Sequence, residues 1–176
     1  MTTTTPSLPT AASPRSLFGF PALVNEVAAR VVASGVVLMT ALYLATGSPL
    51  VLVPLVYGFL ARVAAGPKLS PLGRLAVEVI VPRLPVRGRL VPGPPKRFAQ
   101  SIGATLSSGA LIAQLTGHTD AAFALIAMIT GAALLEAAAG FCLGCTIFGW
   151  LMRAGVIPQD TCEACNDLSK HPAFVD

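Results

Sequence analysis

The sequence predicts an all-α fold, that of a polytopic membrane protein with four transmembrane helices and one interfacial amphipathic helix. Of the 176 residues, 54% are hydrophobic and only 11% are charged, and the mean hydropathy is +0.74. Soluble domains carry about 25% charged residues. A water-soluble fold of this size could not hide so much apolar surface, so lipid is the expected solvent of this chain.

The basic residues support this fold class, because they are separated from the apolar segments. All twelve Lys and Arg residues lie near the start of the first segment, in or near the connection between the second and third, or after the fourth. By the positive-inside rule, both termini are cytoplasmic and the protein is a multi-pass protein of the cell inner (plasma) membrane. The separation argues against a soluble helical protein. It makes the basic residues topology signals and contacts to the lipid bilayer, so no nucleic acid is expected as a partner.

The chain divides into a membrane domain with a polar tail at each end. Residues 1–17 are rich in Thr, Pro and Ser and are predicted to be disordered. They lack the apolar stretch of a secretory signal peptide. Residues 159–176 are expected to form a cytoplasmic C-terminal tail. The four-helix membrane domain is expected over residues 18–158, with spans at about 24–46, 50–65, 98–115 and 121–141.

The first two spans carry polar residues at their cytoplasmic ends. Glu26 and Arg30 are four residues apart, so they can pair on one helix face. Arg62, near the end of the second span, is expected to extend to the lipid headgroups. Pro54 is expected to kink the second span unless it lies in the first helical turn.

The connection between the second and third spans contains a further helix. Ser70 and Pro71 form the pattern of an N-cap followed by proline at the first helical position. Apolar residues at helical spacing follow as far as Ile80. This pattern predicts an amphipathic helix that lies on the membrane surface.

The fourth apolar stretch is too long for one span. It runs from Ala121 to Met152 and is interrupted by Glu136 alone. A single helix of that length would measure about 48 Å, whereas the hydrocarbon core is about 30 Å thick. The helix therefore either projects into the cytoplasm or bends near Gly140.

Several ungapped segments in this order carry a resemblance to a known family. They are VNEVAARVVASGV (Val24 to Val36), TGSP (Thr46 to Pro49), GPKLSPLGRLA (Gly66 to Ala76), PPKRFAQSIG (Pro94 to Gly103) and LEAAAGFCLGC (Leu135 to Cys145). Between about Phe18 and Pro158 the chain resembles the bacterial integral membrane proteins of domain-of-unknown-function family 4395. The resemblance implies a four-helix membrane domain and no established activity. Genes for thioredoxin-like and sulfurtransferase proteins near those of relatives imply such a protein as a partner.

Cys142 and Cys145 form the first of two CxxC pairs. Three residues apart on a helix, they share one face. They could close a disulfide, and a helix that restarts after Gly140 would lower the pKa of the first thiol. The alternative is that both thiols are small apolar fillers. If the fourth span ends near Phe141, the pair emerges at the cytoplasmic interface, which is the arrangement we prefer; if it ends at Met152, the pair is near mid-membrane.

Cys162 and Cys165 form the second CxxC pair, and sixteen residues separate Cys145 from Cys162. This spacing suits a zinc ion held by Cys142, Cys145, Cys162 and Cys165. It also suits an exchange pair that reacts with the first pair. Because cytoplasmic thiols are usually reduced, a permanent structural disulfide is not expected.

Glu136 is an isolated intramembrane acid, which is costly at a helix centre. It is interpreted either as part of a proton or ion relay, or as a protonated Glu hydrogen-bonded to Ser107 or Ser108. Gly140 and Gly144 make a GxxxG step that favours close helix packing within or between chains, which allows a homo-oligomer.

Two functions follow, and the sequence leaves open whether the protein is an enzyme. The first is thiol-redox or sulfur handling, with Cys142 and Cys145 as the redox pair and Cys162 and Cys165 as the exchange pair. The alternative is a non-catalytic membrane scaffold with a structural four-cysteine zinc site. Small-solute transport around Glu136 ranks last, because the chain has no recognisable repeat or pair of broken helices.

Overall fold

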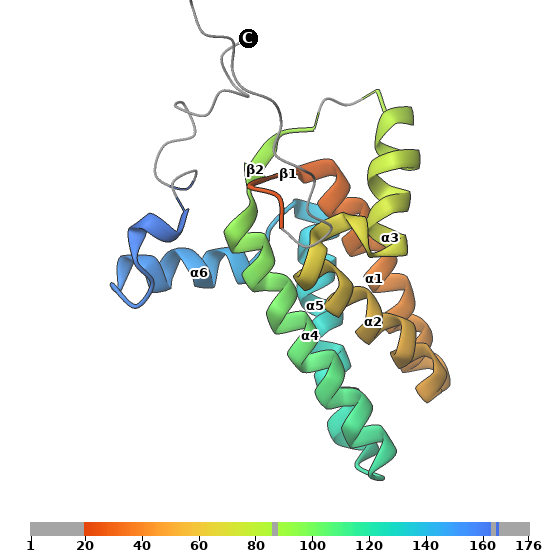
Figure 1. Cartoon of the computed structure of the whole chain (residues 1–176). Coiled ribbons are helices and arrows are strands. Elements are labelled where there is room, and N and C mark those ends of the chain that lie inside the picture. Colours follow the sequence, from red (N-terminus) through yellow and green to blue (C-terminus); the bar gives the residue numbers. More distant parts are fainter. Residues whose placement is uncertain (1–19, 86–87, 163–164, 166–176) are drawn as a thin grey trace, which may run out of the picture.

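The fold is a bundle of four long helices, from which a shorter fifth helix extends sideways beside the third of them (Figure 1). The computed structural model describes residues 20–85, 88–162 and 165. The long helices are α1 (Glu26–Thr46), α2 (Pro49–Ala65), α4 (Gly93–Leu115) and α5 (Thr119–Ala139), and α6 is Leu143–Arg153. Helices α4 and α5 pack along each other, with α2 against α4 and α1 against α5.

The four long helices form two helical hairpins with tight turns at the same end of the bundle. The first turn is possible because Gly47 adopts a left-handed conformation, with φ 63°, and its N–H donates to the Tyr43 carbonyl at 2.7 Å. Tyr43 and Ile126 are fully buried in the core between the hairpins. The Tyr43 hydroxyl donates to Gln114 Oε1 at 2.7 Å, so the polar side chain of α4 is satisfied inside the bundle.

A short antiparallel β-ribbon connects the two hairpins at the end of the bundle away from the tight turns. The all-α prediction did not include these strands. Strand β1 (Leu23–Asn25) pairs with β2 (Leu90–Pro92). The ribbon ties the start of α1 to the start of α4. The Asn25 side chain then caps α1 by accepting hydrogen bonds from the backbone N–H groups of Val27 and Ala28. Each strand has only three residues, which is too short a pattern to identify from sequence.

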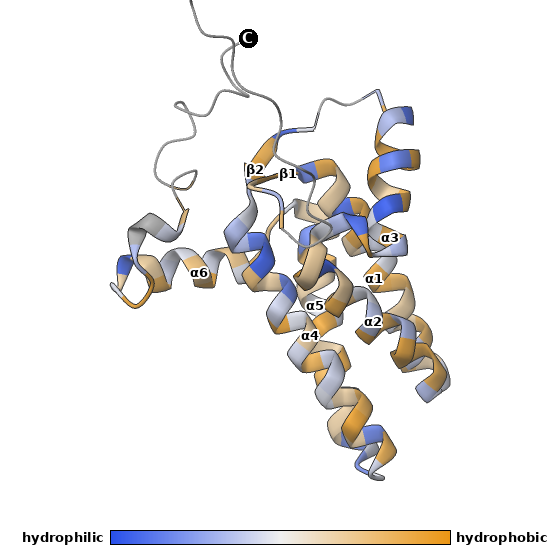
Figure 2. Cartoon of the chain, in the orientation of Figure 1, coloured by the Kyte–Doolittle hydropathy of each residue, from blue (hydrophilic) through white to orange (hydrophobic). Residues whose placement is uncertain are grey.

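Within the part of the chain that the structure describes, three helical stretches are long and apolar enough to cross a membrane: Glu26–Thr46, Pro49–Arg83 and Thr119–Ala139. Their outer faces are apolar, as Leu38 and Leu50 show with exposed fractions of 72% and 78%. This is the pattern of a surface in contact with lipid. Helix α4 contains the predicted third span, 98–115, but it is more polar than the three stretches above and is not among them. Most strongly hydrophilic residues gather at the end of the bundle that carries the β-ribbon (Figure 2).

The segment after α2 is helical, as predicted. The Ser70 side chain accepts a hydrogen bond from the Gly73 N–H, with Pro71 at the first helical position. Helix α3 (Pro71–Arg74) continues into a π-helical stretch, Leu75–Ile80, and a 3-10 turn, Val81–Arg83. The location of this segment at the membrane surface stays a prediction.

Arg62 does not extend outward, contrary to the prediction. Its side chain is buried, with an exposed fraction of 5%. It donates to Gln100 Oε1 at 2.8 Å and to Ser70 Oγ at 3.2 Å, and its guanidinium lies 4.7 Å from the centre of the Phe59 ring. A buried guanidinium is stable only when such partners satisfy it, and these partners are distant in sequence.

The predicted pairing of Arg30 with Glu26 was also wrong. Arg30 donates from Nε to the Ala137 carbonyl at 3.1 Å and from Nη2 to the Ala138 carbonyl at 2.8 Å. These carbonyls belong to the last turn of α5, where backbone acceptors lack helical partners and a cation is favourable. Arg30 therefore stabilises the end of the helix that leads to the first CxxC pair.

Candidate dithiol site

The first CxxC pair lies where the chain bends after α5. Gly140 has a left-handed backbone, with φ 67°, and its N–H donates to the Glu136 carbonyl at 2.9 Å. This conformation ends α5 at Ala139 and decides between the two sequence alternatives: the apolar stretch bends and does not continue as one helix to Met152. Cys142 is the N-cap of the new helix α6, at the end of the bundle opposite the hairpin turns.

The two thiols differ in their surroundings and in their acidity. Cys142 is buried and Cys145, one turn further along α6, is half-buried. A hydrogen bond from the Cys145 thiol, helped by Lys96, lowers the pKa of Cys142 against the opposing effects of burial and Glu136. The same hydrogen bond, together with burial, raises the pKa of Cys145. Cys142 is thus the thiol better able to react as a thiolate, and its place at a helix N-terminus favours the same form.

An ion pair between Lys96 and Glu136 lies beside the thiols. Lys96 is in the first turn of α4 and Glu136 in the last turn of α5, and their side chains have exposed fractions of 9% and 17%. Of the two alternatives for Glu136, the hydrogen bond of a protonated carboxyl to Ser107 or Ser108 is not found among the described residues, and the carboxylate is paired with Lys96. Ser107 instead donates to the Ala104 carbonyl at 3.2 Å.

Lys96 is a site residue that the sequence analysis missed. Its position among the basic residues before the third span had suggested only a topology signal. The Lys96 side chain is buried, and its ion pair with Glu136 compensates the ammonium group for the water that it loses. The sequence did contain one signal for this ion pair. Lys96 comes just before the predicted span 98–115, and Glu136 is near the end of the predicted span 121–141, so both can lie at the same side of the membrane.

Close packing of α6 on α4 fixes the position of the dithiol. A Cβ atom added to Gly144 would lie 2.5 Å from Ala99 Cβ, so only glycine allows this approach. The predicted small-residue packing is therefore found within the chain at Gly144, whereas Gly140 serves as the turn. Packing between chains stays a prediction.

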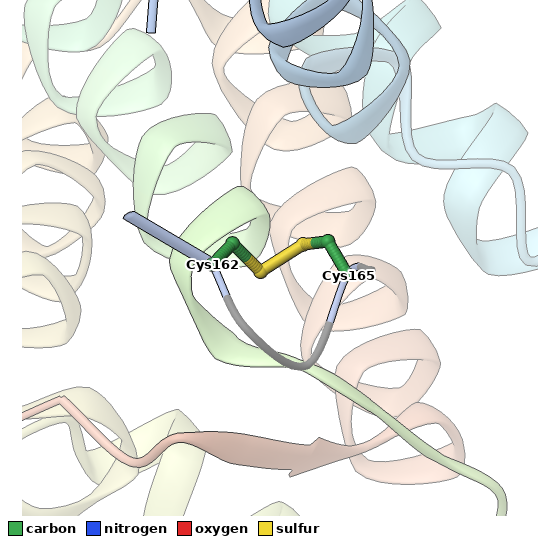
Figure 3. The surroundings of a disulfide bond; sticks show 2 residues. All are labelled: Cys162 and Cys165. Carbon is green, nitrogen blue, oxygen red and sulfur yellow. A yellow bond between two sulfur atoms is a disulfide. The ribbon is translucent and has the colours of Figure 1, made fainter. Parts of the chain in front are cut away.

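The second CxxC pair is joined by a disulfide between Cys162 and Cys165 (Figure 3). Their Cα atoms are 5.3 Å apart, within the range that a disulfide requires. Cys162 is buried against Phe148 and Met152 of α6, and Cys165 is exposed. The sequence analysis had expected reduced or metal-bound thiols here. Most of the predicted C-terminal tail lies outside the described residues.

Two cavities meet at Cys142. The loop-side cavity, of about 500 Å³, includes Glu26, Arg89 and Lys96 in its lining, together with Cys142, Cys145 and Cys165. The bundle cavity, of about 260 Å³, is enclosed mainly by apolar side chains of α1, α4, α5 and α6 and also reaches Glu136. Among the described residues, Cys142 is the one that lines both.

The structure thus brings together Cys142, Cys145, Glu136 and Cys165, but not in the form of a metal centre. Within the described ranges, no three His, Cys, Asp or Glu side chains converge as a set of metal ligands. Cys162 points into its own apolar cluster and is bonded to Cys165. The four-thiolate zinc site stays a prediction that would need this disulfide to be reduced and the tail to rearrange.

Comparison with curated proteins and with solved structures gave no match. A family model does match, over residues 24–153, which include the four long helices and the whole of α6. The matched segment also contains Lys96, Glu136, Cys142 and Cys145, whereas Cys162 and Cys165 follow it. The chain therefore belongs to the family of the domain of unknown function DUF4395.

Proposed function

We propose that this protein is a multi-pass membrane protein whose Cys142–Cys145 pair performs dithiol–disulfide exchange. The observation that carries the proposal is the asymmetry of the pair. Cys142 occupies the N-cap position of α6, its thiol accepts a hydrogen bond from Cys145, and it lies near the Lys96 ammonium. These features would be irrelevant to a thiol that only fills space in an apolar core. They favour the thiolate form of Cys142, as an attacking thiol requires, and they place Cys145 close enough to act as the resolving thiol.

The exchange uses each thiol in turn. The Cys142 thiolate attacks one sulfur of a partner disulfide, forming a mixed disulfide and releasing the other partner sulfur as a thiolate. Cys145 then gives up its proton and attacks Cys142 Sγ, which forms the Cys142–Cys145 bond and releases the second partner sulfur. The protein loses two electrons and the partner gains them. The ion-paired Glu136 carboxylate is near Cys145, and the loop-side cavity gives Cys145 access to solvent, so either can accept its proton.

The Cys162–Cys165 disulfide is one candidate for the partner disulfide. Cys165 lines the same cavity as Cys142 and Cys145, and its exposed position leaves its sulfur open to attack. Cys162 would then be the leaving sulfur. The reduced tail pair would pass the electrons to a soluble thioredoxin-like or sulfurtransferase protein. Sulfur handling by the same thiols is the broader form of this proposal.

The proposed membrane arrangement has four spans, formed by α1, α2, α4 and α5. The described Lys and Arg residues lie at the end opposite the turns at residues 47–48 and 116–118, and the positive-inside rule gives that end to the cytoplasm. The dithiol and both termini would then be cytoplasmic, in the inner membrane, with residues 71–83 at its surface. A reporter that works only in the cytoplasm should be active when it is fused after Asp176. If only a reporter that works in the periplasm is active there, the proposed orientation in the membrane is wrong.

Thiol trapping in intact cells tests the exchange reaction. Cys145→Ser leaves the attacking thiol without its resolving partner, so mixed disulfides should accumulate on Cys142. Cys142→Ser should show none, and it serves as the matched control because it makes the same replacement of sulfur by oxygen one turn away. If all four thiols of the wild type and the three remaining thiols of each variant stay reduced, under oxidising and reducing growth alike, the proposal is wrong.

The alternative proposal is a membrane scaffold with a four-cysteine zinc site. One observation favours it, which is that Cys142, Cys145 and Cys165 line one cavity. It predicts about one zinc ion per chain and a loss of stability on chelation. Protein purified without zinc, and equally stable with and without a chelator, would exclude this function.

A further inference from the structure

The bundle cavity is an apolar chamber that ends at the proposed redox thiol. Its walls include Val32 and Val36 of α1, Leu106 of α4 and Ile129 of α5. Its volume of about 260 Å³ exceeds the roughly 150 Å³ of an engineered apolar cavity that holds benzene. The chamber therefore has room for one substituted six-membered ring.

The outer rim of this chamber is formed by apolar side chains that face away from the bundle. Met128 of α5 has an exposed fraction of 60%, and Leu143 and Ile147 of α6 have exposed fractions of 44% and 41%. In a membrane, these side chains are in contact with lipid. A lipid-soluble molecule can thus enter between α5 and α6 without crossing the charged loop-side cavity.

The inner wall of the chamber carries the polar groups. Cys142 and Glu136 both line it, and Glu136 is ion-paired with Lys96, which lines the cavity on the other side. A reactive sulfur and a proton-carrying pair therefore lie at the apolar end of a lipid-accessible chamber. Cys142 can be reached from the loop side by another thiol and from the bundle side by an apolar molecule.

We propose that the bundle cavity binds a lipid-soluble quinone, which exchanges two electrons with the Cys142–Cys145 pair. This inference rests on the proposed function, run in the opposite direction: a partner dithiol reduces the Cys142–Cys145 disulfide, and the quinone then oxidises the resulting dithiol. In this second step, Cys142 as thiolate and Cys145 as thiol form one S–S bond and supply two electrons and one proton. Glu136, which lines the chamber, passes the second proton to the quinone after receiving it from its ion-pair partner Lys96, and Lys96 is reprotonated from solvent through the loop-side cavity. The quinone gains both electrons and both protons and leaves as hydroquinone.

A quinone fits the bundle cavity and the adjacent dithiol better than other apolar occupants do. A lipid acyl chain would fill the cavity but could accept no electrons from the dithiol. A ring with two carbonyl oxygens fits the volume of the chamber, and one oxygen can lie beside Glu136, which lines the chamber and would donate a hydrogen bond once Lys96 has protonated it. The reaction also matches in stoichiometry, because a dithiol and a quinone each exchange two electrons.

The test uses the full chain in nanodiscs, with Cys162→Ser and Cys165→Ser so that one dithiol remains. The probe is duroquinone, whose ring positions are all substituted, so that thiols cannot add to the ring. The reduced protein should convert duroquinone to its hydroquinone, with one Cys142–Cys145 bond formed for each molecule. The aromatic disulfide 5,5′-dithiobis(2-nitrobenzoate) is the parallel oxidant, expected to reach Cys142 from the loop side.

Ala132→Leu fills the cavity from α5, and Ala29→Leu fills it from α1. Each should slow the reaction with duroquinone about tenfold, the loss expected if about 1.4 kcal/mol of binding is removed. The reaction with the aromatic disulfide should be unchanged, which also shows that the variants are folded. Ala127→Leu is the matched control, because Ala127 is exposed on the same helix and lies outside the cavity lining.

Two results would overturn the inference. One is a wild-type dithiol that reacts with the aromatic disulfide but not with duroquinone, which would leave the proposed function in place. The other is oxidation by duroquinone that neither cavity-filling variant slows more than Ala127→Leu does. A dithiol that reacts with neither oxidant would overturn the proposed function itself.

Discussion

Replacing Gly140 by alanine should destabilise the protein, because the bend that positions the dithiol depends on this residue. Gly140 has φ 67°, a conformation that costs an L-residue about 1–2 kcal/mol. The new Cβ would also lie 2.9 Å from Glu26 Oε1. That carboxylate is the far end of a flexible side chain and can move aside. The expected loss in the free energy of unfolding is therefore about 1–2 kcal/mol, most of it from the backbone.

The sign of this change distinguishes a bend from a continuous helix. If α5 ran on to Met152, Gly140 would be an interior helical residue, and alanine would stabilise it by about 0.5–1 kcal/mol. Gly131→Ala is the matched control, because Gly131 is inside α5 and an added Cβ meets no atom within 4 Å. It should be stabilising. Unfolding in mixed detergent micelles, monitored by circular dichroism, measures the stability of both variants. A Gly140→Ala protein as stable as the wild type would refute the bend.

Two further substitutions test the site. Lys96→Met removes the ammonium that helps to lower the pKa of Cys142, so this pKa should rise and alkylation by iodoacetamide at pH 7 should slow, by about tenfold per pKa unit. An unchanged pH profile would mean that Lys96 does not act on the thiol. Gly144→Ala places a Cβ 2.5 Å from that of Ala99, and it should cost about 1–3 kcal/mol of stability through overpacking. Gly149→Ala, where an added Cβ has open space, should cost less in the same unfolding assay.

Composition and pattern predicted the main features of the fold because these are local properties of the chain. The helices Glu26–Thr46, Pro49–Ala65 and Thr119–Ala139 follow the apolar segments closely. The Ser70 cap follows from two adjacent residues. The bend at Gly140 was one of two alternatives, since sequence spacing does not say whether a glycine in an apolar stretch is helical or left-handed.

The polar contacts inside the bundle could not be predicted in the same way. Arg62 was expected at the headgroups and Arg30 was expected to pair with Glu26, because each has a plausible local role. Their partners, Gln100 and the carbonyls at the end of α5, become neighbours only when the helices pack. Long-range contacts of this kind override local ones when a buried polar group must be satisfied.

The candidate site was predicted in part. Both CxxC pairs were recognised, and Glu136 was singled out as an intramembrane acid. The role of Lys96 was missed, because a lysine before a span normally marks topology. The two cavities that meet at Cys142 arise from five segments of the chain, and no sequence pattern describes them.

The account depends most on the difference between the two thiols of the first pair. The most direct test measures the alkylation rates of Cys142 and Cys145 across a range of pH in the reduced protein in membranes, with each cysteine followed by mass spectrometry. Cys142 should react first and continue to react below the pH range of an ordinary thiol, while Cys145 should lag at every pH. Equal rates, or faster alkylation of Cys145, would contradict the proposed exchange.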